Sequence, residues 1–219
     1  MFNFVPELEI TMTTTLNDKQ KRILEVAEKL FAEKGFDGTS IRNISKDAKV
    51  NIAMVSYYFG SKEKMLEALI YHRTVNLKME LDNILKEDLT PHEKITKLVE
   101  LYIYRITKNK CIYQIVHSEL TNNKRTIDIK SFNEVKKTNL ESLARIIHEG
   151  QEKGVFKKDI NIPLIPPTIL GTYFHFNMNR PYYEDLLNIQ SDEAFDAYIK
   201  NELTQHIQQT IKALLTNES

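Results

Sequence analysis

Residues 39–66 read TSIRNISKDAKVNIAMVSYYFGSKEKML, and this stretch is the most informative part of the sequence. In its first half, apolar residues recur at a spacing of three and four, which places one face of a short helix inward: Ile41, Ile44 and Ala48. Val55 and Phe59, four residues apart, give the inner face of a second short helix. Two such helices bury little surface alone, so they need a third helix to pack on. The pattern predicts a helix-turn-helix whose second helix presents its outer face to a DNA major groove.

The segment upstream supplies the third helix. Asn17 and Gln20 are expected to form a capping box at the start of a helix over residues 18–34. Thr39 and Asn51 are the expected N-caps of the two short helices, because their side-chain oxygens can accept a hydrogen bond from an unpaired backbone N–H. Three helices of this size make one small domain, which we place at residues 17–66 after a flexible arm of residues 1–16.

From residue 23 to residue 66 the chain resembles the DNA-binding domain of the TetR family of bacterial transcription regulators. Several features at fixed spacing carry the resemblance: LFAEKGF at 30–36, Thr39-Ser40-Ile41, the turn at Val50, Tyr57-Tyr58-Phe59 and Ser61-Lys62-Glu63. Together they span about a fifth of the chain and are far more specific than a lone helix-turn-helix pattern. The resemblance implies a sequence-specific regulator that binds double-stranded DNA as a homodimer.

Matching positions in the family motif indicate which residues contact DNA. Candidates for base contact lie at outward positions of the two motif helices: Arg42, Ala53, Met54, Ser56 and Tyr57. Candidates for contacts to phosphates or at helix ends flank them: Thr39, Asn51, Tyr58 and Lys62. Arg42 has the best chemistry for reading a base, because a guanidinium can bridge O6 and N7 of guanine. Two plainer roles stay open, since Tyr58 also fits a core position and Arg42 and Lys62 also fit solvated charges.

The motif departs from the family pattern in its second helix. Ile52 and Ala53 stand where many relatives have a polar or basic residue and a glycine, and Ser56 replaces a commoner tyrosine. Apolar side chains at these positions favour contact with thymine methyl groups over hydrogen-bonded readout. The operator sequence therefore does not follow from these residues.

Composition and charge fit a DNA-binding protein of the cytoplasm. The net charge is zero, but residues 12–66 hold ten Lys or Arg against seven Asp or Glu, which puts a basic excess in the predicted reading head. The single cysteine, Cys111, is typical of a reducing compartment. No apolar run reaches the roughly 20 residues of a membrane span.

We expect no catalytic, cofactor or metal site. The chain has neither a Walker loop nor a GxSxG motif. Glu202 and His206 stand four residues apart as one isolated pair, whereas a di-metal helical bundle needs repeated Glu-x-x-His pairs. A solvated helix face is the better interpretation of that pair.

Residues 67–219 are predicted to form a larger helical domain for ligand binding and dimerisation, so that the fold is all-α with about nine helices. One long helix is expected over residues 62–86, and a capping box at Thr90 and Glu93 begins another that ends at residue 108. Further helices are expected over residues 111–121, 126–149, a segment ending near 179, and 191–215. The last has an apolar stripe that runs from Phe195 to Leu214.

The resemblance implies that this domain encloses a pocket for an unknown small molecule and dimerises through its last two helices. Aromatic and histidine side chains of the middle helices are the candidate lining: Tyr102, Tyr113, His117, Tyr173, His175 and Phe176. An aromatic stripe at helical spacing is more often ordinary core than a ligand pocket. The most consistent function is a repressor that a ligand releases from a palindromic operator. An activating or effector-independent regulator, or a small-molecule-binding protein with a vestigial helix-turn-helix, remains an alternative.

Overall fold

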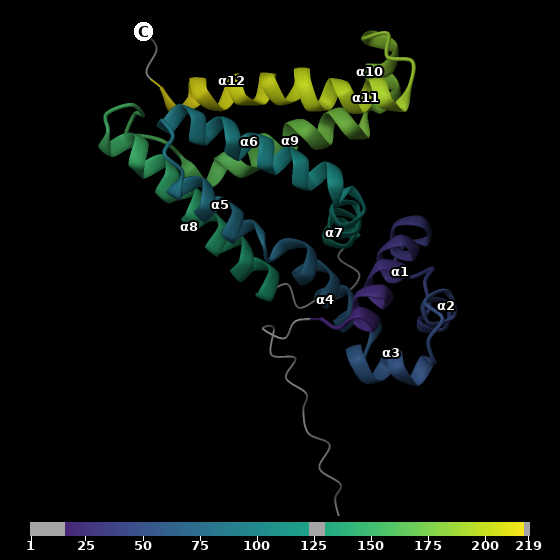
Figure 1. The fold of residues 1–219 in the computed structure, drawn as a ribbon. Coiled ribbons are helices and arrows are strands. Elements are labelled where there is room, and N and C mark those ends of the chain that lie inside the picture. Colours follow the sequence, from purple (N-terminus) through teal and green to yellow (C-terminus); the bar gives the residue numbers. More distant parts are fainter. Residues whose placement is uncertain (1–15, 123–129, 217–219) are drawn as a thin grey trace, which may run out of the picture. The chain divides into compact units, whose positions relative to one another are not determined.

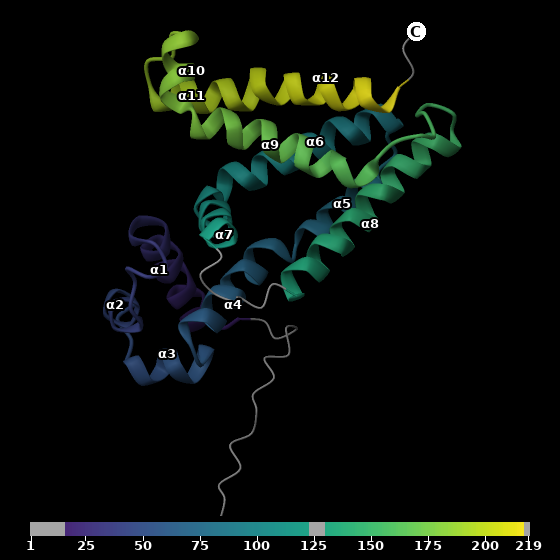
Figure 2. The same ribbon diagram turned by 180° about the vertical axis from the view of Figure 1, so that it is seen from behind.

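The computed structural model describes residues 16–122 and 130–216, and the regular elements in those ranges are all helices (Figures 1 and 2). This confirms the predicted all-α class. The chain divides into two compact units, with the boundary between Leu69 and Ile70, whereas the sequence analysis placed it at residue 66. The predicted arm lies almost wholly in residues 1–15, outside the described residues, as do residues 123–129 and 217–219.

The N-terminal unit contains α1 (Asp18–Lys34), α2 (Ile41–Asp47), α3 (Ile52–Phe59) and the start of α4 (Lys62–Thr74). The predicted capping box is confirmed, since the Asn17 side chain accepts from the Gln20 N–H and the Gln20 side chain accepts from the Asn17 N–H. Apolar side chains from all four helices and from the α1–α2 loop are buried together: Ile23, Leu24, Ala27, Leu30, Phe31, Phe36, Ile44, Ala48, Val55, Phe59, Met65, Leu66 and Leu69.

The prediction of a single long helix over residues 62–86 is wrong. The structure has two helices there, because α4 ends at Thr74 and α5 runs over Leu77–Lys86. Near the break, helix carbonyls accept bonds from side chains: Arg105 Nη2 donates to the Arg73 oxygen, and Thr74 Oγ1 donates to the Ile70 oxygen, both at 2.8 Å. Arg105 lies 32 residues further along the chain. A local apolar pattern carries no trace of such a contact.

The C-terminal unit continues with α6 to α12 and two short irregular helices. Their bounds are α6 (Pro91–Lys108), α7 (Lys110–Asn122), α8 (Lys130–Glu152), the 3-10 helix η1 (Ile162–Leu164), α9 (Ile165–Met178), α10 (Arg180–Leu186), α11 (Asp192–Tyr198), the π-helix η2 (Ile199–Leu203) and α12 (Thr204–Leu215). Both ribbon views show α5 alongside α8 and α12 alongside α6 (Figures 1 and 2). The core of this unit lies among α5, α6, α8, α9 and α12.

A π-helical segment lies within the last predicted helix. Thr204 Oγ1 donates to the Ile199 oxygen, five residues back, at 2.7 Å. The predicted apolar stripe is buried on both sides of this segment, as Phe195, Ile207 and Ile211 show. It is wrong only at its end, where Leu214 is 43% exposed and Leu215 is buried.

Candidate nucleic-acid interface

Helix α3 has one buried face and one exposed face. Val55 and Phe59 point inward, as predicted, and are 0% and 2% exposed. The Asn51 side chain accepts a hydrogen bond from the Ala53 N–H at 2.9 Å, which confirms Asn51 as the N-cap. The opposite face carries large side chains in solvent, with Tyr57 75% exposed and Ile52 48% exposed. A tyrosine left so exposed on an eight-residue helix is available for contact with another molecule.

The remaining candidates for base contact also reach the surface. Arg42, on α2, is exposed, as are Ala53 and Ser56 on α3. Met54 is half-buried. The chain enters α3 through Lys49, whose φ of 54° belongs to the left-handed region, and the Val50 N–H closes the turn on the Ser45 oxygen at 3.0 Å. This tight turn fixes α3 relative to α2.

The structure gives Thr39 an internal role. Its side chain is 1% exposed, and its hydroxyl donates toward the Leu30 oxygen at 3.0 Å and the Gly35 oxygen at 2.9 Å. The predicted N-cap is therefore wrong by one residue: Ser40 caps α2, because its hydroxyl accepts from the Asn43 N–H at 3.1 Å. The buried Thr39 hydroxyl instead ties the loop before α2 to the end of α1.

Lys62 forms a clamp that sequence reasoning missed. Its ammonium donates to the carbonyl oxygens of Phe36 and Thr39, both at 2.8 Å, and lies 4.2 Å from the centroid of the Phe36 ring. The first turn of α4 is thereby fixed to the α1–α2 loop. A lysine ammonium has three donors, and these two carbonyls use two of them. No local sequence signal predicts the contact, because its partners lie 23 and 26 residues upstream.

Tyr58 is half-buried between its aromatic neighbours. Its ring centroid lies 5.5 Å from that of Tyr57 and 6.3 Å from that of Phe59, both edge to face. Such pairs stabilise the ring positions beyond the area that they bury. Tyr58 therefore supports the outward position of Tyr57 as well as lying at the surface itself.

The predicted ligand residues fall into two groups. The first contains Tyr102, Tyr113 and Tyr173. Burial raises the pKa of the Tyr102 and Tyr113 phenols, and the nearby Tyr113 raises the pKa of Tyr102 further. Phe174 links Tyr113 to Tyr173, with ring centroids 5.9 and 5.8 Å away, respectively. We call Tyr102, Tyr113, Tyr173 and Phe174 the aromatic group. Tyr102 and Tyr173 are buried and Tyr113 is half-buried.

The second group lies elsewhere in the C-terminal unit. The buried Phe176 ring stacks on Tyr183, Phe195 and Tyr198, with centroids 4.4 to 5.5 Å away. His175 is exposed beside it and, like Phe176, lines a cavity of about 760 Å³ between α9, α10 and the start of α12. That cavity also includes Glu202 and His206. The side chain of His117 lies outside the described residues.

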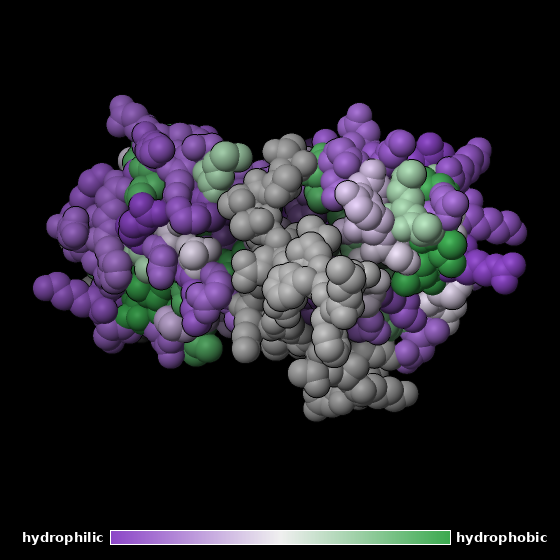
Figure 3. Space-filling view, turned by 90° about the horizontal axis from the view of Figure 1, so that it is seen from below, coloured by the Kyte–Doolittle hydropathy of each residue, from purple (hydrophilic) through white to green (hydrophobic). Residues whose placement is uncertain are grey.

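Among the described residues there is neither a cluster of metal ligands nor a membrane-spanning helix. They contain no group of three or more His, Cys, Asp or Glu side chains that could hold a metal ion. Their helices are also too short or too polar to cross a membrane. On the face drawn in Figure 3, hydrophobic residues lie in small groups separated by hydrophilic ones.

Comparisons with known proteins cover both units. Residues 23–69 match the model for bacterial regulatory proteins of the tetR family, and residues 91–211 match the model for the tetracyclin repressor-like C-terminal domain. The HTH-type transcriptional repressor NicS of Pseudomonas putida is 30% identical over 167 residues, which cover 72% of this chain and 75% of NicS.

Two solved structures share the fold. The fatty acid degradation regulator FadR from Bacillus halodurans has a TM-score of 0.70 at 22% identity, covering 91% of this chain and 97% of that one. FadR from Bacillus subtilis, solved in complex with stearoyl-CoA, has a TM-score of 0.68 at 19% identity, covering 89% of this chain and 98% of that one.

Proposed function

This chain belongs to the tetR family of bacterial regulatory proteins, and we propose that it is a repressor that a small molecule releases from a palindromic operator. It is a DNA-binding transcriptional regulator, like the relatives named above. Repression itself is proposed by likeness to NicS, which is named a repressor. We propose that the protein acts in the cytoplasm, on bacterial DNA, and that it has no enzymatic activity.

The outer face of α3 is the observation that carries the proposal. Tyr57 and Ile52 are exposed there, and the exposed Arg42 lies on the neighbouring helix α2. We propose that this face enters the major groove, where Arg42 reads a guanine edge and the apolar side chains contact thymine methyl groups. Ala53, Met54 and Ser56 complete the surface that meets the bases.

The ends of the helices would hold the phosphates. Lys62 keeps one ammonium donor beyond the two that bind Phe36 and Thr39, and we assign that donor to a phosphate oxygen. Tyr58 and the exposed Asn51 flank the same motif. Thr39 is left out of the proposed interface, because its hydroxyl is buried and bonded internally.

Regulators of this family act as dimers on DNA operators, and we propose that this chain dimerises through α9 and through the last helix, α11 to α12. Exposed apolar side chains on these helices support the assignment, with Met178 67% exposed on α9 and Leu214 43% exposed on α12. A two-fold dimer matches a palindromic operator and doubles the contacts that one small reading head can make.

For the effector, we propose the aromatic group as the site and a molecule with a long apolar part as the class. The group brings together aromatic rings of α6, α7 and α9, two of them buried and two half-buried, and three phenol hydroxyls. This composition suits a ligand that is mostly apolar with few polar atoms. The stearoyl-CoA complex of Bacillus subtilis FadR supports this class. The effector would act by favouring a dimer whose reading heads do not fit adjacent grooves.

Operator binding tests the proposal directly. Fluorescence anisotropy of the purified protein on labelled DNA from upstream of its own gene should show tight, salt-dependent binding that unrelated DNA does not displace. Arg42→Ala should weaken specific binding by about 1 to 3 kcal/mol, the value of one good bidentate base contact. The proposed function would be contradicted if the protein bound its own upstream DNA and the promoter fragments of the neighbouring genes as weakly as unrelated DNA.

A further inference from the structure

Helix α6 holds both ends of α5 through basic side chains. Arg105 Nη2 donates to the Arg73 oxygen, in the last turn of α4, and Lys94 Nζ donates to the Leu85 oxygen, in the last turn of α5, both at 2.8 Å. The last carbonyls of a helix have no partner within it and carry partial negative charge. Each cation therefore satisfies a helix C-terminus, one on either side of α5.

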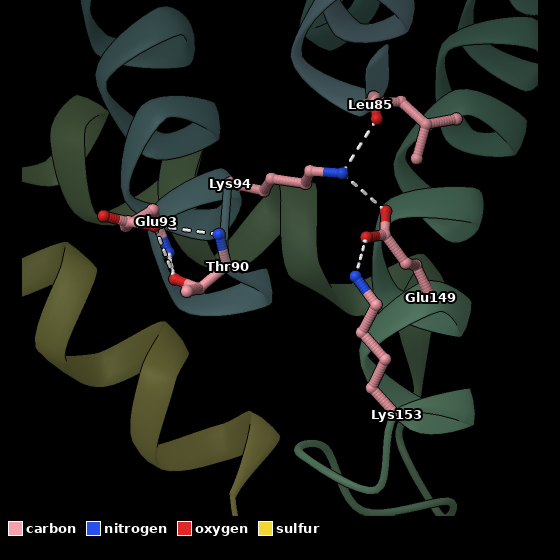
Figure 4. A network of polar contacts seen from close by, with 6 residues as sticks. All are labelled: Leu85, Thr90, Glu93, Lys94, Glu149 and Lys153. Atoms are coloured by element: carbon pink, nitrogen blue, oxygen red, sulfur yellow. Dashed lines mark hydrogen bonds and ion pairs between the residues drawn. The ribbon is translucent and has the colours of Figure 1, made fainter. Parts of the chain in front are cut away.

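Each cation also binds a carboxylate. Lys94 Nζ lies 2.7 Å from Glu149 Oε2, and Lys153 Nζ binds the other oxygen of Glu149 at 2.6 Å (Figure 4). Arg105 Nη1 lies 2.7 Å from Glu80 Oε2. The side chains of Lys94 and Arg105 are only 5% and 11% exposed. Charges buried this far must be paired, so both contacts are specific attachments.

Arg105 differs from Lys94 because it also lies near the tyrosines of the aromatic group. It stands three residues from Tyr102 on α6, so the two side chains share a helix face. Its positive charge lowers the pKa of Tyr102 and of Tyr113, against the larger opposite effect of burial. The guanidinium is therefore within electrostatic reach of both phenols of the aromatic group. On one side it meets the α4–α5 junction, and on the other the proposed effector site.

We propose that Arg105 is the positioning residue through which the effector site controls α4. This inference rests on the proposed function. A ligand in this site with an acceptor that binds the guanidinium competes with the Arg73 oxygen and Glu80 for the same donors. Loss of these bonds frees the end of α4, which continues across Leu69 into the DNA-binding unit. The clamped junction belongs to the DNA-binding state, and the released junction to the ligand-bound state.

Matched variants of the two clamps test the inference in the full-length protein. Arg105→Met removes the clamp at the α4–α5 junction, and Lys94→Met removes the clamp at the far end of α5. We expect Arg105→Met to weaken operator binding at least tenfold and Lys94→Met to change it less than threefold. Arg105→Lys, which can keep only one of the two bonds at full strength, should lie between them.

Hydrogen exchange separates positioning from unfolding. In Arg105→Met, amides of residues 74–80 should exchange faster while those of residues 17–69 keep their wild-type protection. Unchanged operator affinity in Arg105→Met, an equal loss in both Met variants, or lost protection of residues 17–69 would each overturn the inference. If Arg105→Met does not fold, Arg105→Lys is judged by the same criteria. Failure of the wild-type protein to bind specific DNA would instead contradict the proposed function.

Discussion

The two units use buried or half-buried cations in different ways. In the N-terminal unit, the acceptors of Lys62 are two neutral carbonyl oxygens, so its positive charge is not cancelled by them. In the C-terminal unit, Arg105 and Lys94 each bind a carbonyl and also a carboxylate. An uncancelled cation attracts phosphates over several ångströms, whereas a paired one acts only as a local attachment. The same side-chain chemistry thus favours DNA in one unit and cross-links helices in the other.

The charge of the helix-turn-helix segment agrees with this difference. Residues 12–66 contain ten Lys or Arg and seven Asp or Glu, although the whole chain is neutral. The C-terminal unit pairs many of its charges across helices, as in the contact of Arg145 on α8 with Asp82 on α5. The basic excess therefore lies in the segment that carries the proposed DNA contacts.

The largest effect is expected where a paired cation loses its carboxylate. Glu149→Leu leaves the buried Lys94 ammonium with only the Leu85 carbonyl, and should lower the free energy of unfolding by about 3 to 5 kcal/mol. Lys94→Met should cost less, because Glu149 is partly exposed and keeps Lys153. Urea unfolding of both variants measures the difference. If Lys94→Met instead lost more stability than Glu149→Leu, the unpaired Glu149 carboxylate would be more destabilising than the unpaired Lys94 ammonium.

Lys62→Met should destabilise the protein by about 2 kcal/mol, since it removes two charge-assisted hydrogen bonds and a cation–π contact. Lys64→Met is the matched control, because Lys64 lies two residues further along α4 and is exposed. Urea unfolding followed by hydrogen exchange in residues 17–69 reports on the unit concerned. If both variants lose the same stability, the clamp contributes nothing.

Tyr57→Ala should weaken DNA binding without changing the stability of the fold. Its side chain is 75% exposed, so the free energy of unfolding should change by no more than about 0.5 kcal/mol. Operator affinity should fall about tenfold, if the tyrosine meets the bases as proposed. Phe59→Ala, on the buried face of the same helix, should lose about 3 to 5 kcal/mol of stability. Anisotropy and urea unfolding of this pair distinguish the two faces, and wild-type affinity in Tyr57→Ala would remove Tyr57 from the interface.

The smallest expected effect is the loss of stability at acidic pH that comes from the Glu149 carboxyl. Hydrogen bonds from Lys153 and then from Lys94 hold the pKa of Glu149 below its ordinary value of 4.5. A carboxyl with a lowered pKa contributes stability above its unfolded pKa, and that contribution is lost as the pH falls through the folded pKa. Stability should therefore decline as the pH falls below about 4.5. Urea midpoints between pH 7 and pH 3 should decline less steeply in Glu149→Gln, and parallel curves would exclude this carboxyl as a source.

Much of the N-terminal unit follows from local sequence signals. The capping box at Asn17 and Gln20, the Asn51 cap, and the inward positions of Val55 and Phe59 all depend on residues within one or two helical turns. Thr39 shows the limit of such signals. Two adjacent hydroxyls could each cap α2, and only packing against α1 determines that Thr39 turns inward and Ser40 caps.

The C-terminal unit was harder to predict because its irregular points depend on distant residues. The break between α4 and α5 lies where Arg105 binds the Arg73 carbonyl, 32 residues away in sequence. In the last helix, the neighbours Leu214 and Leu215 are both apolar, and only the packing of the unit determines that Leu215 is the buried one. In the N-terminal unit, the contact of Lys62 was equally hard to predict, because its two carbonyl acceptors lie 23 and 26 residues upstream.

The salt dependence of operator binding tests the contrast between the two kinds of cation most directly. The slope of log affinity against log salt concentration counts the protein cations that replace counterions on the phosphates. For Lys62→Met we expect a slope smaller by about one. For Arg105→Met we expect a weaker affinity with an unchanged slope, because Glu80 pairs with that charge within the C-terminal unit. An unchanged slope for Lys62→Met, or an equal reduction in both variants, would mean that the two cations do not differ in their contact with phosphates.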